Sequence, residues 1–150
     1  MGGRGRAGTA FLALSAVSGP AGEAAFGSTT AKSLRCAAKT QVKYLLGANP
    51  GKQAFVTGLD IIDGFDTSIA VPQNPRHRAA SCKGEVCYGL GENNPHKLLG
   101  ALVGGPKPDG SYTDSRIAEP DNLVSLEFNG PFTGAVAGLT AIEDTLSCSA

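Results

Sequence analysis

Two short polar segments carry side chains that could bind a ligand or move a proton. They contain Arg76, His77 and Arg78 in the first case, and Tyr112, Asp114 and Arg116 in the second. Carboxyl and imidazole groups can exchange protons near neutral pH, and guanidinium groups donate hydrogen bonds to oxygen atoms. The residue types also fit simpler roles, with the basic run as a solvated turn and Asp109 and Asp114 as turn formers. Both interpretations stay open at this level.

Other catalytic motifs find no support. The run from Gly47 to Lys52 superficially resembles a phosphate-binding loop, but it has one residue too few between its glycines and Gln53 follows the lysine. The chain has no Gly-x-Ser-x-Gly elbow and no Asn-x-Ser/Thr glycosylation site. A nucleotide-binding protein and a serine hydrolase are therefore poor interpretations.

The charge balance restricts the partners. The 150 residues include 13 basic and 13 acidic side chains, so the net charge is zero. Such a surface generates no field that would attract nucleic acid or an anionic membrane, and no segment is long enough to span a bilayer. A neutral polymer or a small neutral ligand suits it better. The 21 glycines and 9 prolines predict many turns and long loops within one modest domain.

Four cysteines are present, and two of them are close in sequence. In an oxidising compartment the spacing of Cys82 and Cys87 favours a local disulfide. A zinc site formed by these two cysteines with His77 and His96 is a weaker alternative, because the gaps do not match the usual paired spacing. Two buried free thiols are the third possibility. We predict no metal and no cofactor.

Helices are predicted at both ends of the chain. Residues 6–17 are good helix formers that Gly19-Pro20 should stop, and Ser28-Thr29-Thr30 offers N-caps for a second helix. The apolar face of that second helix is formed by Leu34, Ala38, Val42 and Leu45. A last helix should begin near Pro131, so that this proline lies in the first turn of the helix. Its apolar face is formed by Phe132, Ala135, Val136, Leu139, Ile142 and Leu146.

The middle of the chain, residues 52–121, shows no long period. Residues 55–57 and 67–71 could be short extended pieces, and residues 96–103 a helical turn or a buried strand. Long ordered loops in a compact domain usually carry function. We therefore expect a ligand cleft built from these loops.

Three blocks in order carry a family resemblance. The first is Gln41-Val-Lys-Tyr-Leu-Leu-Gly-Ala-Asn-Pro50 with Gln53-Ala-Phe-Val-Thr-Gly58, and the second is Asn74-Pro-Arg-His-Arg-Ala-Ala-Ser-Cys82 with Cys87. The third is Leu99-Gly-Ala-Leu-Val-Gly-Gly-Pro106, then Tyr112-Thr-Asp-Ser-Arg116 and residues 122–137. Together they resemble glycoside hydrolase family 9, the inverting endoglucanases or cellulases, over about residues 31–140.

The resemblance implies a fold and a setting. Residues 1–150 would be the C-terminal part of the catalytic domain, all-α, forming the last helices of an (α/α)6 toroid with long loops on one face. Residues 8–18 match a helix of the family, which makes a leader peptide the less favoured interpretation of the N-terminus. The family further implies a secreted protein that acts on β-glucan without a cofactor. The N-terminal part of the catalytic domain is a possible partner.

Glycoside hydrolysis needs two carboxyl groups, one that protonates the leaving oxygen and one that activates water. In the family the base belongs to an upstream Asp-Ala-Gly-Asp motif, which these residues do not contain. The acid is the Glu that follows the Asn of the third block, and Leu123 stands there in this chain. Leucine cannot carry a proton. Glu127, one helical turn further on, is more simply an ordinary solvated charge than a substitute acid.

The remaining site residues come from the second and third blocks. The family's Pro-His-His-Arg segment contacts sugar hydroxyls, so Arg78 could bind a glucan, with His77 beside it and Arg76 replacing the family's first His. Asp114 would lie near the acid position as a catalytic candidate. Tyr112 and Arg116 would support its loop and, with Arg76, His77 and Arg78, would bind the substrate. Residues 60–73 look like an insertion near the cleft.

Three hypotheses follow for the 150 residues. They are a segment of an endo-β-1,4-glucanase that is inactive alone, a non-catalytic glucan-binding or interaction remnant, and a truncated product without a role. Helix faces that lack their partners should make the isolated chain marginally stable.

Overall fold

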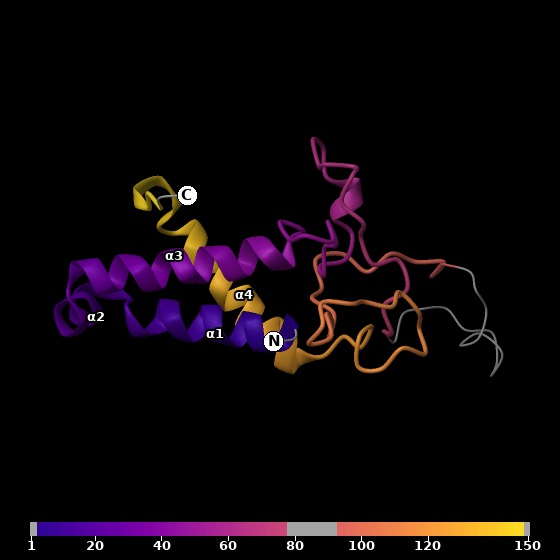
Figure 1. The fold of residues 1–150 in the computed structure, drawn as a ribbon, viewed down its shortest axis with the longest axis horizontal. Coiled ribbons are helices and arrows are strands. Elements are labelled where there is room, and N and C mark those ends of the chain that lie inside the picture. The colour runs from indigo at the N-terminus through magenta and orange to yellow at the C-terminus, as the bar shows by residue number, and fades with distance from the viewer. Residues whose placement is uncertain (1–2, 78–92, 149–150) are drawn as a thin grey trace.

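The computed structural model describes residues 3–77 and 93–148. Its helices are α1 (Gly3–Ala16), α2 (Gly19–Phe26), α3 (Ser28–Leu45) and α4 (Leu126–Thr140), with single 3-10 turns η1 (Leu59–Ile61) and η3 (Glu143–Thr145). The described residues contain isolated β-bridges and no named strand. The helices occupy one end of the molecule and the loops the other (Figure 1). The all-α prediction is confirmed.

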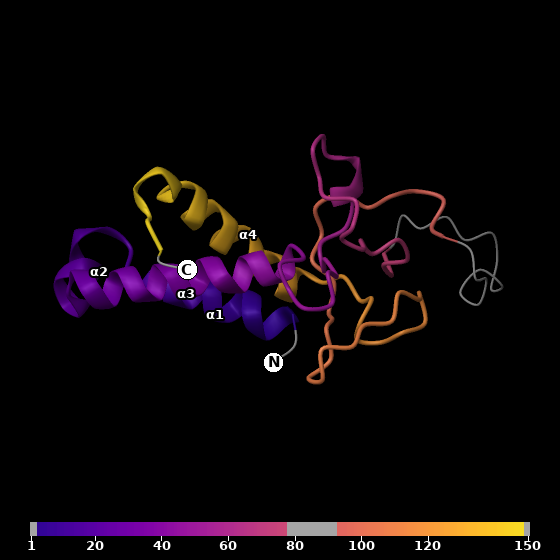
Figure 2. The same ribbon diagram turned by 45° about the horizontal axis from the view of Figure 1, so that its top comes forward.

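Helix α1 is the centre of the helical end. It packs against both α3 and α4, and α4 crosses it obliquely (Figure 2). The crossing is close because Gly134 of α4 has no side chain: a Cβ there would lie 2.6 Å from the ring of Phe11. A larger residue at 134 would displace the ring of Phe11 or move the two helices apart.

The helix boundaries in the first third of the chain differ in part from the predictions. The first helix stops before Gly19-Pro20 as predicted, but residues 19–26 then form α2, with Pro20 in its first turn where the missing N–H costs no hydrogen bond. Helix α3 begins at Ser28, and its N-cap is Gly27 with no side-chain cap. The prediction of a Ser or Thr cap was therefore wrong. The apolar face of α3 is confirmed, with Ala38, Val42 and Leu45 buried.

The start of the last helix was also predicted wrongly. Helix α4 begins at Leu126, so Pro131 lies inside it rather than in its first turn. A proline inside a helix loses one hydrogen bond, and Ser125, the N-cap of α4, was the local signal for the earlier start. Phe132 and Ala135 are buried as predicted, whereas Ile142 and Leu146 lie beyond the end of the helix and are partly buried.

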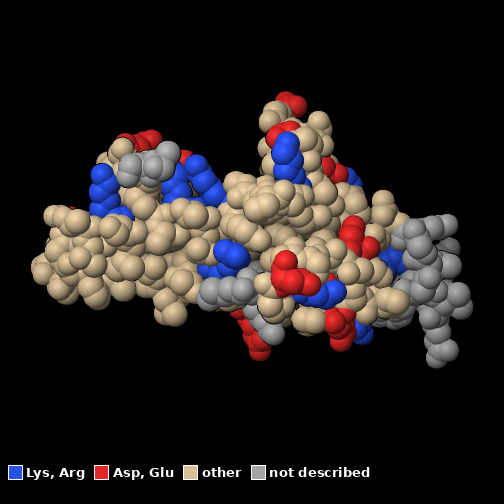
Figure 3. Space-filling view, in the orientation of Figure 1, with Lys and Arg blue, Asp and Glu red and all other residues tan. Residues whose placement is uncertain are grey.

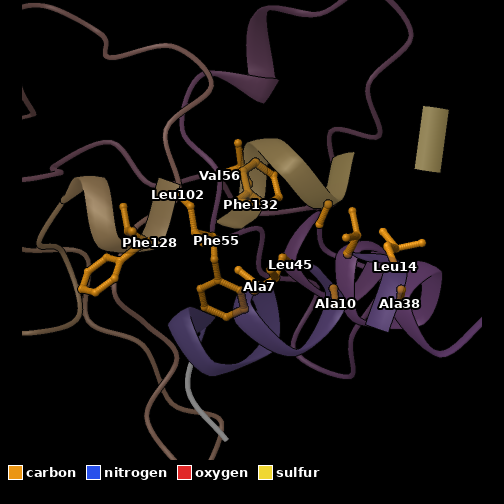
Figure 4. Packing of buried hydrophobic residues seen from close by; sticks show 13 residues of the cluster. Ala7, Ala10, Leu14, Ala38, Leu45, Phe55, Val56, Leu102, Phe128 and Phe132 are labelled. Carbon is orange, nitrogen blue, oxygen red and sulfur yellow. The ribbon is translucent and has the colours of Figure 1, made fainter. Parts of the chain in front are cut away.

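Apolar contacts join the loops to the helices. Figure 4 shows Phe55 beside Ala7 and Leu45, and Val56 and Leu102 beside α4. The backbone N–H of Phe55 donates to the carbonyl of Leu45 at 2.8 Å, and Val56 bridges Leu102 in antiparallel fashion. The extended piece at 55–57 is confirmed, and the ambiguous run 96–103 is extended over its last residues. One core therefore runs from the helices into the loop end.

The side chains of two asparagines fix the loops by forming hydrogen bonds with backbone groups. The amide of Asn49 donates to the carbonyls of Tyr44 at 2.8 Å and Gln53 at 2.7 Å, which closes the turn after α3. Asn129 of α4 accepts the N–H of Leu102 at 2.7 Å and donates to its carbonyl at 3.0 Å. Both residues lie in the blocks quoted above, and both have structural roles.

The helical end leaves large apolar side chains in solvent. Leu12 is 67% exposed and Leu126 is 91% exposed, and Phe11 and Phe26 are partly exposed. At the loop end, by contrast, side chains of both signs are interspersed on the face shown in Figure 3. No helix among the described residues combines the length and the apolar character needed to cross a membrane.

We expect these exposed apolar faces to limit the stability of the isolated chain. Expressed alone, it should bind a hydrophobic dye such as ANS, lose its near-ultraviolet circular dichroism readily and aggregate on heating. Calorimetry and dye binding measure this. A sharp, cooperative melt of a soluble monomer is the contrary result.

Candidate active site

The described start of the second block, residues 74–77, lies beside the third block at the loop end. The N–H of Arg76 donates to the carbonyl of Asn122 at 2.7 Å, and Arg76 bridges Leu123 in parallel fashion. The segment with the sugar-contacting candidates thus runs alongside the segment that holds the acid position. The two segments are far apart in the sequence, so their contact could not be predicted from it. The fold brings them together.

Asn122 is the centre of this arrangement. Its side chain is fully buried, and its amide donates to the carbonyls of Thr113 at 3.2 Å and Ser115 at 3.0 Å and to Asp114 Oδ1 at 3.1 Å. Its carbonyl oxygen accepts the hydroxyl of Tyr112. A buried amide that uses both ends in this way fixes the loop 112–116 against the acid position. The sequence placed Asn122 in a block but gave it no role.

The chain passes very close to itself beside this amide. A Cβ at Gly104 would lie 2.0 Å from the carbonyl oxygen of Pro120, and the N–H of Gly105 donates to the carbonyl of Asp121 at 2.8 Å. Only glycine fits such an approach. The Gly-Gly pair of the third block therefore sets the position of residues 120–122.

Asp114 is an exposed carboxylate whose oxygens accept backbone amides. Its Oδ2 accepts the N–H of Gln73 and its Oδ1 that of Asn74, both at 2.9 Å. Together with the bond from Asn122, these contacts join the start of the second block to the loop 112–116. This geometry favours a positioning function. Its catalytic role stays a prediction.

Tyr112 is largely buried under the same loop. Its ring packs edge-on against Phe55, with centroids 5.5 Å apart. Burial, followed by the charges of Asp114 and Asp121, raises the pKa of the Tyr112 hydroxyl far above its ordinary value. The hydroxyl therefore stays protonated and acts as a hydrogen-bond donor, which agrees with its bond to Asn122.

Arg116 is buried rather than exposed to a ligand. Its Nε donates to the side chain of Asn94, whose amide donates to the carbonyl of Pro75 at 2.8 Å. This chain of contacts connects the third block to the second through a residue that the sequence analysis did not single out. It favours the predicted supporting role of Arg116 over direct contact with a substrate.

Arg76 and His77 are the described members of the basic run. Arg76 is exposed and forms an ion pair with Glu119, which the sequence analysis also missed. His77 is half-buried, and its Nε2 has no hydrogen-bond partner among the described residues. Burial is the largest influence on the pKa of His77 and lowers it, so the ring is neutral at neutral pH. A guanidinium and a neutral imidazole are suitable groups for binding hydroxyls.

The predicted acid position holds no titratable group. Leu123 is half-buried and packs against the hydrophobic core. Glu127 is exposed in the first turn of α4, as an ordinary solvated charge would be. In residues 3–77 and 93–148, no group of His, Cys, Asp or Glu is arranged to hold a metal ion. Leu123 cannot protonate a leaving group.

Some predicted residues lie outside the described part of the chain. Arg78, Cys82 and Cys87 belong to residues 78–92, so their predicted roles stay predictions. The structure adds a disulfide that the sequence analysis did not propose, between Cys36 of α3 and Cys148 after η3. The even number of cysteines was the available signal, because pairing Cys82 with Cys87 leaves these two.

Replacing Asn122 by Ala should reduce the free energy of unfolding by about 3 kcal/mol, because the hydroxyl of Tyr112 and two carbonyls would remain buried without their partner. Denaturant unfolding measures the change. The control is Asn93→Ala, which removes the side chain of an exposed asparagine at the loop end. It should change the free energy of unfolding by less than about 0.5 kcal/mol. Equal effects of the two substitutions would contradict a central role for Asn122.

The sequence profile of glycosyl hydrolase family 9 matches residues 4–136. The chain belongs to this family. An endoglucanase of Dictyostelium discoideum is 40% identical over 99 residues, which are 66% of this chain and 13% of the relative. Endoglucanase 1 of Persea americana is 32% identical over 151 residues, which cover 89% of this chain and 29% of the relative. The chain thus spans less than a third of these curated relatives.

Solved family 9 structures agree with the fold. The endoglucanase of the termite Nasutitermes takasagoensis superposes with a TM-score of 0.70 at 32% identity, covering 94% of this chain and 30% of the termite chain. Endoglucanase CelQ of Clostridium thermocellum, solved with cellobiose and cellotriose, gives a TM-score of 0.67 at 32% identity, over 99% of this chain and 22% of CelQ. The four helices are therefore a portion of the family 9 (α/α)6 barrel, as the resemblance implied.

Proposed function

We propose that this chain is the C-terminal part of an endo-β-1,4-glucanase catalytic domain and forms one wall of its glucan cleft. The full domain would hydrolyse internal β-1,4-glucosidic bonds of cellulose with inversion. The observation that carries the proposal is the contact between Arg76 and residues 122–123, because it brings the sugar-contacting candidates to the acid position. Cello-oligosaccharides bound to CelQ support the substrate class.

Each residue then has a defined part. Arg76 and His77 would bind sugar hydroxyls, with Arg78 next to them. Asp114, Tyr112, Arg116 and Asn122 would hold the two segments together through the hydrogen bonds described above. Leu123 occupies the position of the proton donor, so the 150 residues by themselves should hydrolyse no glucan.

A second candidate function is glucan binding without catalysis. The specific observation in its favour is that the hydrogen-bonded frame around Asn122 is intact although position 123 holds a leucine. Loss of the proton donor removes chemistry but leaves hydrogen-bond donors for hydroxyls in place.

Retention on cellulose tests the binding part. The chain with its disulfide intact should be retained, and Arg76→Ala should weaken retention about tenfold, because a hydrogen bond to a charged group is worth about 1.5–3 kcal/mol. Lys32→Ala, at an exposed position of α3, removes a positive charge away from the loops and is the control. No retention of the parent chain, or equal losses in both variants, would argue against a glucan cleft at Arg76.

We also propose an extracellular location, with no nucleic acid or membrane as partner. The disulfide between Cys36 and Cys148 supports it, because such bonds persist in oxidising compartments. The balanced charge agrees with a neutral polysaccharide. The N-terminal part of a family 9 domain would be the natural packing partner of the exposed faces of α1 and α4.

A further inference from the structure

A loop between residues 59 and 70 stands out from the loop end of the molecule (Figure 1). Its base is held on both sides: the N–H of Ala54 donates to the carbonyl of Ala70, and the N–H of Ala70 donates to that of Lys52, both at 2.8 Å. Within the loop, the N–H of Phe65 donates to the carbonyl of Ile62 at 3.1 Å, and that of Ile69 to Asp66 at 3.0 Å. The protrusion is therefore an ordered surface that needs little rearrangement to bind a ligand.

Asp60 connects this loop to the candidate site. Its Oδ2 forms an ion pair with Lys97 and accepts the amide of Gln73 at 3.3 Å. The backbone N–H of the same Gln73 donates to Asp114 at 2.9 Å. One residue thus touches both the protruding loop and the site, so the two surfaces are continuous.

Three exposed aliphatic side chains lie within two residues of Asp60 or Lys97 in the sequence. Ile61 is 58% exposed, Ile62 is 56% exposed and Leu99 is 59% exposed. Leu99 packs over Gly58 at the start of the loop, where a Cβ would lie 2.6 Å from its Cδ2. We call the surface formed by Asp60, Ile61, Ile62, Lys97 and Leu99 the Ile61 ridge.

We infer that the Ile61 ridge is an additional binding surface for a β-glucan chain, beyond the units held at residues 73–77. The inference rests on the proposed function. A glucan chain has apolar C–H faces and hydroxyls along its edges, and the ridge has exposed aliphatic groups next to a carboxylate acceptor and an ammonium donor. Isoleucine and leucine contact the ring faces, and Asp60 and Lys97 bind the hydroxyls. The ridge thereby selects longer chains.

Oligosaccharides of two lengths test the ridge. In NMR titrations of the disulfide-intact chain, cellohexaose should bind more tightly than cellotriose and shift the amide signals of residues 60–62. The double variant Ile61→Ser/Ile62→Ser should weaken cellohexaose binding about tenfold and leave cellotriose binding unchanged. Leu12→Ser removes an exposed aliphatic side chain of α1 and should change neither affinity.

The outcomes separate the two proposals. Equal affinity of the parent for both sugars, or equal weakening of both by the double variant, overturns the ridge and leaves the proposed function standing. Absence of binding of either sugar overturns both. The same titrations can be repeated with a chimaera in which residues 4–136 replace the matching segment of the termite endoglucanase. This chimaera tests both proposals in a complete barrel.

Discussion

Replacing Leu123 by Glu in the chimaera with the termite endoglucanase should raise the rate of hydrolysis of a soluble cellulose derivative about a hundredfold to ten-thousandfold, the usual contribution of a general acid. The chimaera contains the upstream segment of the termite enzyme and the frame around Asn122, so the missing part is the proton donor. The backbone of Leu123 bridges that of Arg76, so we expect a carboxyl at position 123 to lie beside the candidate sugar-binding segment. Release of reducing sugar measures the gain.

A matched substitution separates the effect of proton donation from the effect of side-chain shape. Leu123→Gln has nearly the same shape as Leu123→Glu but cannot donate a proton to the leaving oxygen, so this chimaera should stay as inactive as the Leu123 parent. In the isolated 150 residues, neither the parent nor the Leu123→Glu variant should release sugar, because the upstream base is not among them. An active Leu123 chimaera, or equal rates for the two substitutions, would show that position 123 does not carry the acid.

Removal of the Cys36–Cys148 disulfide should have the second-largest effect, a loss of folding stability. The two cysteines are 112 residues apart. Cross-linking a loop of about 100 residues lowers the entropy of the unfolded chain, which raises the free energy of unfolding by up to about 4–5 kcal/mol. The bond joins the middle of α3 to the chain after α4, so it encloses every site segment. The double variant Cys36→Ser/Cys148→Ser should therefore unfold at a much lower denaturant concentration.

The second cysteine pair supplies the comparison. If Cys82 and Cys87 form the predicted local bond, Cys82→Ser/Cys87→Ser should cost about half as much, because a short loop loses less entropy on closure. Denaturant unfolding with and without a reducing agent measures both variants. A Cys36–Cys148 variant as stable as the parent would contradict the stabilising role of the long-range bond.

Asparagine and aspartate side chains that bind backbone groups help to hold the loop end together. Asn49, Asn122, Asn129 and Asp114 each satisfy amides or carbonyls that no strand ladder serves. This explains how a long region with few regular elements keeps a defined shape. It also explains why several residues of the family blocks have no visible chemistry: they position the residues that do.

Local patterns in the sequence determined a good part of this protein. The apolar face of α3 and the extended piece at 55–57 follow from the spacing of residue types over a short stretch, whereas the class of fold followed from the family resemblance. The ordered blocks identified the family and predict that Leu123 stands at the position of the catalytic acid. These features depend on residue type and order, which the chain states directly.

Only the tertiary structure decided the rest. The start of α4 at Leu126, the burial of Arg116 against Asn94, the ion pair of Arg76 with Glu119 and the Cys36–Cys148 bond all depend on partners far away in the chain. A polar side chain can pair with many groups of the right kind, and its sequence neighbours do not specify which one. The packing of α1, α3, α4 and the loops makes that choice, because it decides which polar groups lie within hydrogen-bond reach of one another.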